Sequence, residues 1–151
     1  MSAAYNSDRS VSAMKRTLDA FYNEYDFKER LMHDPVEFPH RYSNPDDIET
    51  AGFIAACFAY GKIGLFKPVI ERVLSPGGRH PAEFFRNFDL KKDKKYFQGI
   101  SYRFNKETDV LCLIYILSRT LQDRGSLREL FYINYRPGHE DIKNALSGFI
   151  N

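Results

Sequence analysis

Cations and aromatic rings alternate in the segment from Leu90 to Lys106. The side chains that could contact phosphates are Lys91, Lys92, Lys94 and Lys95, followed by Arg103 and Lys106. The rings interleaved with them belong to Tyr96, Phe97, Tyr102 and Phe104. Nucleic-acid binding uses these two residue types, because cations contact phosphates and rings stack on bases. The alternative interpretation is a solvated helix face whose rings point into the core.

A second candidate is the turn Tyr60-Gly61-Lys62, which presents a large side chain and a cation beside a glycine between two expected helices. Turns of this kind can enter a groove, although most only connect helices. The complete set of candidate nucleic-acid-binding residues is Tyr60, Gly61, Lys62, Lys91, Lys92, Lys94, Lys95, Arg103, Asn105 and Lys106.

No pattern typical of a catalytic or metal site occurs in the chain. His33 and His40 are separated by prolines and lack the spacing of metal ligands on one helical face. The Gly77-Gly78 pair is followed by Arg-His rather than by Lys-Ser or Lys-Thr, so it predicts a turn and not a phosphate-binding loop. We therefore assign no catalytic residue, no metal and no cofactor, and we do not expect this chain alone to be an enzyme.

Composition favours one globular domain over residues 1–151. Hydrophobic residues make up 43% and charged residues 28% of the 151. The net charge of +2 is small, so any basic surface must be a local patch. Cys57 and Cys112 both lie in apolar runs, which predicts buried, reduced thiols. No apolar stretch reaches membrane-spanning length and the N-terminus lacks a signal-peptide pattern, so we expect a cytoplasmic protein with no membrane partner.

Apolar residues recur at helical spacing almost throughout, without strand alternation. This predicts an all-α fold, a compact bundle of about seven to nine helices with no significant sheet. The expected helices cover 11–25 with Ser10 as the cap, 27–32, 45–59, 63–74, 81–88, 90–97, 106–123 with Asn105 as the cap, a short helix after Ser126, and 140–150. The clearest boundaries are Asn44-Pro45 at a start and Gly125 at an end.

Two further expectations concern exposure. The segment 35–44 contains two prolines and predicts a loop with exposed aromatic side chains. Ile142, Leu146 and Phe149 form an apolar face on the last helix. That face either folds back on the domain or contacts a partner, which would be a second copy in a homodimer or a missing C-terminal region.

Four runs carry a family resemblance, namely 34–42 (DPVEFPHRY), 47–56 (DIETAGFIAA), 58–61 (FAYG) and 102–105 (YRFN). They closely resemble a bacterial family known only as domain of unknown function 2400, over about Leu18 to Phe131. Members of that family are longer. Their second half carries a Leu-Asp-Thr-His-Val-like motif, similar to the one that holds the catalytic aspartate of helix-hairpin-helix DNA glycosylases.

The resemblance implies that this chain is similar to the N-terminal half of such a glycosylase. Tyr60, Gly61 and Lys62 would then lie where a residue is wedged into DNA beside a flipped base. The segment from Gly99 to Lys106 resembles a glycosylase stretch reading Gly-Leu-Tyr-Asn-x-Lys-Ala, of which the glycine, an aromatic, the Asn and the Lys recur.

Neither a helix-hairpin-helix signature nor a Leu-Asp-Thr-His motif occurs in this chain. We therefore expect a domain that binds double-stranded DNA without complete catalytic machinery, any catalytic residues lying beyond Asn151. The alternative is a helical protein-interaction module with no nucleic-acid role, whose partner surface is the apolar last helix.

Overall fold

The computed structural model describes the backbone of residues 2–150 and the side chains from Val11 to Ile150. Within that range the chain forms nine α-helices and four short 3₁₀ helices, and no strand, which confirms the all-α prediction. The single β-bridge there joins Tyr102 to Asn105. The chain divides into two units, Met1–Met32 and His33–Asn151, which are described separately.

The first unit consists of helices α1 (Ser2–Glu24) and α2 (Phe27–Leu31). Helix α1 begins at Ser2, so the expected start at Val11 with Ser10 as its cap is wrong. The prediction failed because serine, although common at helix starts, also occurs inside helices. The apolar side chains along α1 are exposed, namely Val11, Met14, Leu18, Phe21 and Tyr22. Asp26 caps α2 by accepting the Glu29 amide hydrogen at 2.9 Å.

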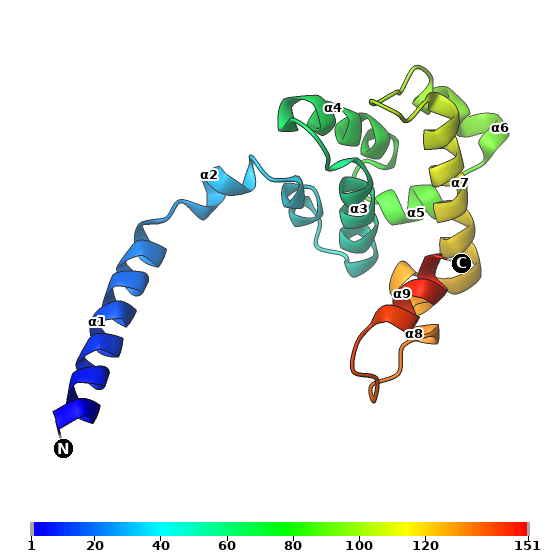
Figure 1. Cartoon of the computed structure of the whole chain (residues 1–151). Coiled ribbons are helices and arrows are strands. Elements are labelled where there is room, and N and C mark those ends of the chain that lie inside the picture. Colours follow the sequence, from blue (N-terminus) through cyan, green and yellow to red (C-terminus); the bar gives the residue numbers. More distant parts are fainter. Residues whose placement is uncertain (1, 151) are drawn as a thin grey trace. The chain divides into compact units, whose positions relative to one another are not determined.

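The second unit contains the remaining helices (Figure 1). The α-helices are α3 (Pro45–Phe58), α4 (Ile63–Leu74), α5 (Pro81–Arg86), α6 (Leu90–Asp93), α7 (Glu107–Arg124), α8 (Leu127–Ile133) and α9 (Lys143–Ile150). The 3₁₀ helices are η1 (Pro35–Glu37), η2 (Pro39–Arg41), η3 (Ser75–Gly77) and η4 (Lys94–Phe97).

Helix α3 packs against η2, α4 and α5 and supplies much of the core of this unit. Its start is as predicted, because the Asn44 side chain accepts the amide hydrogens of Asp46 and Asp47, and Pro45 occupies the first turn. A Cβ at Gly52 would stand 3.8 Å from Pro39, so the neighbour of α3 at this point is the 3₁₀ helix η2.

Helix α7 is the longest in the second unit and packs against α5 and α8. Its buried face carries Val110, Ile114, Leu117 and Leu121, spaced three or four residues apart, and Leu113 is partly buried beside it. Its cap is Lys106 rather than Asn105, and the Lys106 amide donates to Asp109 at 2.7 Å. The helix ends at Gly125, which has φ 82°, and the Ser126 side chain then caps α8, both as predicted.

Burial overturns two predictions made from local sequence. Phe38, in the supposedly exposed loop, is completely buried and belongs to the core. Cys112 is exposed and Cys57 half-buried, so neither is the fully buried thiol that the apolar runs suggested. Burial among apolar neighbours raises the pKa of the Cys57 thiol. The thiol prediction failed because the residues of an apolar run on a helix face several directions, and packing decides which of them are covered. The loop prediction failed because prolines indicate an irregular backbone but not the exposure of its side chains.

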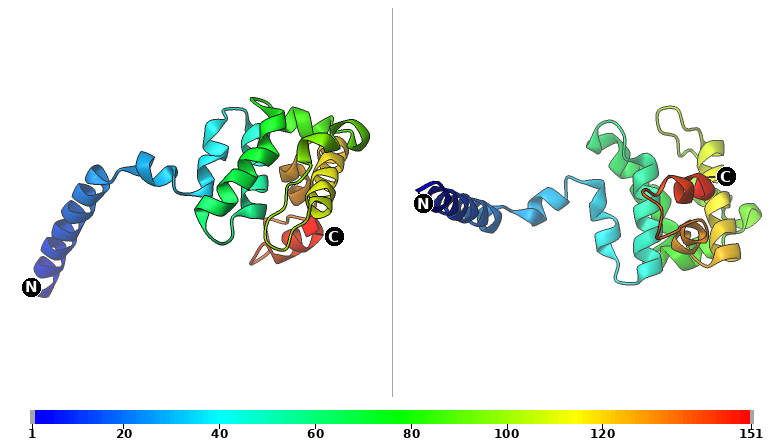
Figure 2. Two further views of the ribbon diagram at one scale, coloured as in Figure 1. Left: turned by 90° about the horizontal axis from the view of Figure 1, so that it is seen from above. Right: turned by 60° about the horizontal axis from the view of Figure 1, so that its bottom comes forward.

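The last helix folds back on its own unit, the first of the two expected outcomes. Helix α9 lies against α8 (Figures 1 and 2). Ala145 is buried, and Phe149 packs against the core. Ile142 and Leu146 remain exposed. No helix within residues 2–150 is long and apolar enough to cross a membrane.

Candidate nucleic-acid interface

The turn after α3 is held in a backbone conformation that only glycine adopts easily. Ala59 ends the helix, and Gly61 follows with φ 88°. A Cβ at Gly61 would stand 2.9 Å from the Tyr102 hydroxyl oxygen and 3.0 Å from the guanidinium carbon of Arg103. Gly61 is therefore required twice, for its φ and for the close approach of a second turn.

That second turn is a tight reversal between the bridged residues Tyr102 and Asn105. Two backbone hydrogen bonds of 2.9 Å each join them, which places Arg103 and Phe104 at the tip. Arg103 has φ 53°, the left-handed conformation that a long side chain adopts at an energetic cost. Such a conformation persists only where surrounding contacts enforce it.

Tyr60 and Tyr102 supply those contacts by locking the two turns together. The Tyr102 hydroxyl donates to the carbonyl oxygen of Tyr60, and the Tyr60 hydroxyl donates to the carbonyl oxygen of Tyr102 at 3.3 Å. The rings pack with centroids 4.9 Å apart. The Asn105 side-chain amide donates to the Tyr60 hydroxyl at 3.0 Å. We call Tyr60, Tyr102 and Asn105 the tyrosine lock.

The outer side of the locked turns is basic. Lys62, Arg103 and Lys106 are exposed, and none of them forms an ion pair with any residue that the structure describes. The Arg103 guanidinium lies 5.9 Å from the centre of the Tyr60 ring, within cation–π distance. Phe104, at the tip, exposes 87% of its surface. We call Lys62, Arg103, Phe104 and Lys106 the two-turn surface.

The four lysines of the candidate set form a separate group, the lysine run, on α6 and η4 (Lys91, Lys92, Lys94 and Lys95). All four are exposed. Asp89 caps α6 by accepting the Lys91 and Lys92 amide hydrogens at 2.8 and 3.2 Å. These two bonds lower the pKa of the Asp89 carboxyl. In Figure 1, α6 is drawn on the opposite side of α7 from α4, the helix that follows Lys62.

The structure thus brings Tyr60, Gly61, Arg103 and Asn105 together, with Lys62 and Lys106 adjacent in sequence, while the lysine run lies apart. Arg72 of α4 donates to the carbonyl oxygens of Gln98 and Gly99, in the segment between η4 and Tyr102, at 3.0 and 3.4 Å. The interleaved rings divide evenly: Phe97 and Tyr102 are buried in the core, and Tyr96 and Phe104 are exposed. Each of the two interpretations of this segment therefore describes half of its aromatic rings.

Sequence reasoning placed Tyr60 at a wedge, but its ring and hydroxyl are engaged in the lock. It left out of the candidate set both Tyr102, which anchors the lock, and Phe104, which is the exposed ring. A left-handed residue at a two-residue turn is usually signalled by Gly, Asn or Asp. Arg103 gives no such signal, so the sequence offered nothing from which this turn could be predicted.

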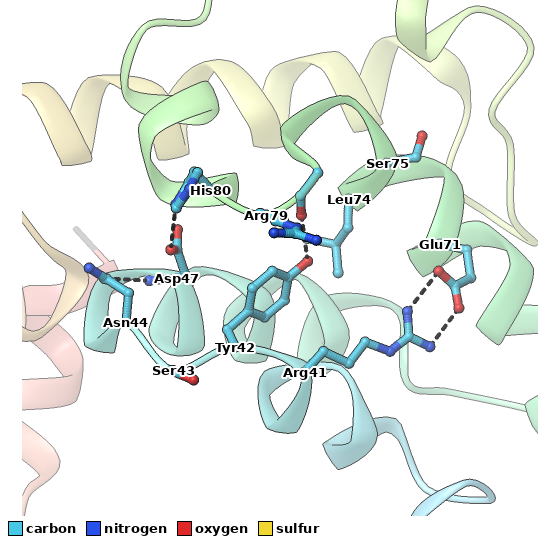
Figure 3. Close-up of a pocket in the computed structure, with 11 residues that line it drawn as sticks. Arg41, Tyr42, Ser43, Asn44, Asp47, Glu71, Leu74, Ser75, Arg79 and His80 are labelled. Atoms are coloured by element: carbon cyan, nitrogen blue, oxygen red, sulfur yellow. Dashed lines mark hydrogen bonds and ion pairs between the residues drawn. The ribbon is translucent and has the colours of Figure 1, made fainter.

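A cavity of about 610 Å³ lies among η2, α3, α4 and the segment after η3, away from the candidate residues (Figure 3). On one side of it, Arg41 donates to both Glu71 oxygens at 2.8 and 2.6 Å, and it also pairs with Glu37. This guanidinium lowers the pKa of the Glu71 carboxyl. Burial raises the pKa of the Tyr42 phenol, which donates to the Gly78 carbonyl oxygen at 3.4 Å.

On the other side of the cavity, the buried Asp47 carboxylate accepts the Ala82 amide hydrogen at 2.9 Å and lies 3.6 Å from His80 Nδ1 (Figure 3). The carboxylates that line this cavity are therefore satisfied by groups of the same chain: Glu71 ties α4 to η2, and Asp47 ties α3 to α5. Among the residues that the structure describes, no three His, Cys, Asp or Glu side chains are grouped so that they could hold a metal ion.

Comparison with curated proteins and with solved structures gave no match. The family model described as "Protein of unknown function (DUF2400)" matches residues 34–151. The match begins after α2 and extends past Phe131 to the last residue, so it covers the second unit rather than the expected range from Leu18. Because it includes most of the sequence, the chain belongs to the DUF2400 family of proteins of unknown function.

Proposed function

We propose that the second unit binds double-stranded DNA through the two-turn surface and the lysine run. The observation that carries this proposal is the position of Lys62 and Arg103. The tyrosine lock brings these cations to adjoining turns, although 41 positions separate them in the sequence, and neither has an acidic partner among the described residues. Unpaired cations beside an exposed ring are suited to phosphate contact.

The two groups of cations contribute differently to this binding. The lysines of α6 and η4 are exposed and offer charge at the surface, which supports attraction that is independent of DNA sequence. Lys62 and Arg103 stand on a fixed backbone and therefore hold the phosphates in a defined register. The proposal is one of binding, and it assigns no catalytic residue to this chain.

The resemblance to helix-hairpin-helix DNA glycosylases supports a finer proposal, a role in bacterial DNA repair in the cytoplasm. The supporting residues are the run from Gly99 to Lys106, which resembles a glycosylase segment, and the turn Tyr60-Gly61-Lys62, where the resemblance would put a wedge and where Lys62 is the exposed side chain. In this view the chain supplies DNA contacts, and a region like the second half of the family's longer members supplies the chemistry.

The test is the salt dependence of DNA binding by the full chain. Arg103→Ala and Lys94→Ala should each flatten the slope of log K against log salt by about 0.9, the value for one lost contact with a duplex phosphate. Lys143→Ala is the matched control, because Lys143 is an exposed cation at the start of α9, drawn at the other end of the unit from the two-turn surface in Figure 1. Absence of binding, or equal slopes in all variants, contradicts the proposal.

The second candidate function is a protein-interaction module. It is favoured by the apolar side chains that remain exposed on α9 after it has folded back, namely Leu146 and Ile150. Leu146→Asp tests it better than a change at Phe149, because Phe149 packs against the core and its substitution would disturb the fold. Light scattering that shows a dimer in the wild type and a monomer in Leu146→Asp, together with no DNA binding, would support this function over the first.

A further inference from the structure

Phe104 is the most exposed of the large apolar side chains for which the structure gives an exposure. It presents 87% of its surface to solvent, compared with 80% for Ile150 near the end of the chain and 48% for Tyr115 on α7. Exposed single apolar residues are common on proteins and need no explanation by themselves. What distinguishes Phe104 is the turn that carries it.

The backbone beneath Phe104 is fixed before any partner binds. Its neighbours Tyr102 and Asn105 are joined by two hydrogen bonds of 2.9 Å, and Tyr102 is only 6% exposed. The tyrosine lock attaches this turn to the end of α3. A ring presented on a fixed backbone loses little conformational entropy when it is covered, so such a ring is suited to recognition.

Charge indicates which partner the ring suits. Arg103 and Lys106 flank Phe104 within two positions, and Lys62 follows Gly61, at which a Cβ would stand 3.0 Å from the guanidinium carbon of Arg103. An apolar protein surface would cover these three cations without neutralising them, at a cost in desolvation. Anchoring in a lipid interface normally needs a larger apolar face than one ring. A single ring between cations matches a nucleobase between its phosphates.

Building on the proposed function, we infer that Phe104 stacks on a nucleobase, so that the two-turn surface prefers DNA with an unpaired or unstacked base over a continuous duplex. In a continuous duplex the ring can reach a base face only by separating stacked neighbours, which costs a few kcal/mol per step. An abasic site, a bulge or a mismatch lowers that cost. The preferred ligand class is therefore locally distorted duplex DNA.

The experiment measures the affinity of the full chain for two probes of the same sequence, a continuous duplex and a duplex with a one-nucleotide bulge. Phe104→Ala should weaken binding to the bulged probe by about 5- to 150-fold, the range for loss of one stacked base. Binding to the continuous duplex should change by less than about 3-fold, because its contacts are mainly to phosphates. Tyr115→Ala is the control for loss of an exposed ring elsewhere.

Two further variants separate stacking from apolar contact. Phe104→Tyr keeps a ring and should retain the preference for the bulged probe, whereas Phe104→Leu keeps an apolar side chain and should lose it. A 2-aminopurine at the bulge gives a second readout, because its fluorescence responds to stacking. The wild type should change this signal on binding, and Phe104→Ala should not.

Failure of this inference differs from failure of the proposed function. If Phe104→Ala binds both probes like the wild type, or weakens both equally, the stacking role is wrong while salt-dependent DNA binding stands. If the wild type binds neither probe, both are wrong. Binding to anionic vesicles that depends on Phe104, without binding to either probe, would identify the two-turn surface as a lipid site and overturn the inference.

Discussion

The two-turn surface and the lysine run contain the same residue types and are organised in opposite ways. In the lysine run, four exposed lysines stand on α6 and η4, and the cap by Asp89 orders the start of that segment. On the two-turn surface, fewer cations stand on a backbone that hydrogen bonds tie to another turn 42 to 45 positions away in sequence. The two regions thus differ in what holds their backbone, which is a local cap and the buried Phe97 in the lysine run and hydrogen bonds between distant turns on the two-turn surface.

This difference explains why the lysine run is easier to recognise in the sequence than the two-turn surface. A local cluster of charge is visible in any sequence, but the sequence does not show how its backbone is held. Here η4 is anchored by Phe97, which is buried against Phe84 and Phe88. The two-turn surface looks weaker in the sequence, because its members are dispersed. Defined recognition depends on groups held in place before the ligand arrives, and the tyrosine lock does this.

The largest expected effect is on the free energy of unfolding, and it compares Gly61, beside the two-turn surface, with Gly99, which follows the lysine run. Gly61 and Gly99 both have positive φ, 88° and 69°. A Cβ at Gly61 would clash with the Tyr102 hydroxyl at 2.9 Å, whereas a Cβ at Gly99 would meet open space. Gly99→Ala should lower the free energy of unfolding by about 1–2 kcal/mol, the cost of a left-handed conformation. Gly61→Ala should lower it by about 2–4 kcal/mol, because the clash adds to that cost. Denaturant unfolding measures both, and equal losses would mean that the two turns do not hold each other.

A smaller effect is expected from removing one hydroxyl group in each region. Tyr102→Phe deletes the hydrogen bond to the Tyr60 carbonyl oxygen and should cost about 1 kcal/mol of the free energy of unfolding. Tyr96→Phe is the matched change beside the lysine run, where the ring is exposed. It should stay within about 0.5 kcal/mol of the wild type. Thermal unfolding of the pair tests this, and similar stability of the two variants would argue against the lock.

The smallest effect concerns the cap of the lysine run and its dependence on pH. The pKa of Asp89 is lowered in the folded chain by the Lys92 and Lys91 amides, so the carboxylate stabilises α6 at pH values above its unfolded pKa. That stabilisation is lost as pH falls through the lowered folded pKa. Hydrogen exchange of the Lys91 and Lys92 amides should therefore accelerate relative to the core when the pH is taken below about 4.

Two variants make the Asp89 prediction specific. Asp89→Asn retains a neutral capping oxygen, so its protection should be independent of pH in this range. Asp89→Ala should lose protection at every pH. Neither change should alter the Tyr102 and Asn105 amides, and an effect there would show that the two regions are coupled more closely than their separate positions indicate.

Much of the fold could be predicted from the sequence because helices are local structures. The Asn44 cap with Pro45 located the start of α3, and Gly125 with Ser126 located the end of α7 and the start of α8. Local rules failed where one signal serves several structures. Ser10 lies inside α1, and Asn105, which looked like a cap, donates to Tyr60 instead.

The candidate site was only half predictable for the same reason. The cations were identified from their residue types, and the structure leaves them exposed. The roles of the rings were not identified, because nothing in the local sequence distinguishes a buried ring, such as Tyr102, from an exposed one, such as Phe104. Packing makes the first two a lock and leaves the third at the tip of a turn.

The sequence by itself determined the helical class, the principal helix boundaries and the positions of the cations. These depend on hydrophobic periodicity and on capping contacts between residues at most a few positions apart. Only the tertiary structure decided that Gly61 meets Tyr102 and Arg103, that Phe38 is buried and that Phe104 is exposed. Those outcomes depend on which faces meet when distant segments pack, and the local order of residues does not specify which faces those are.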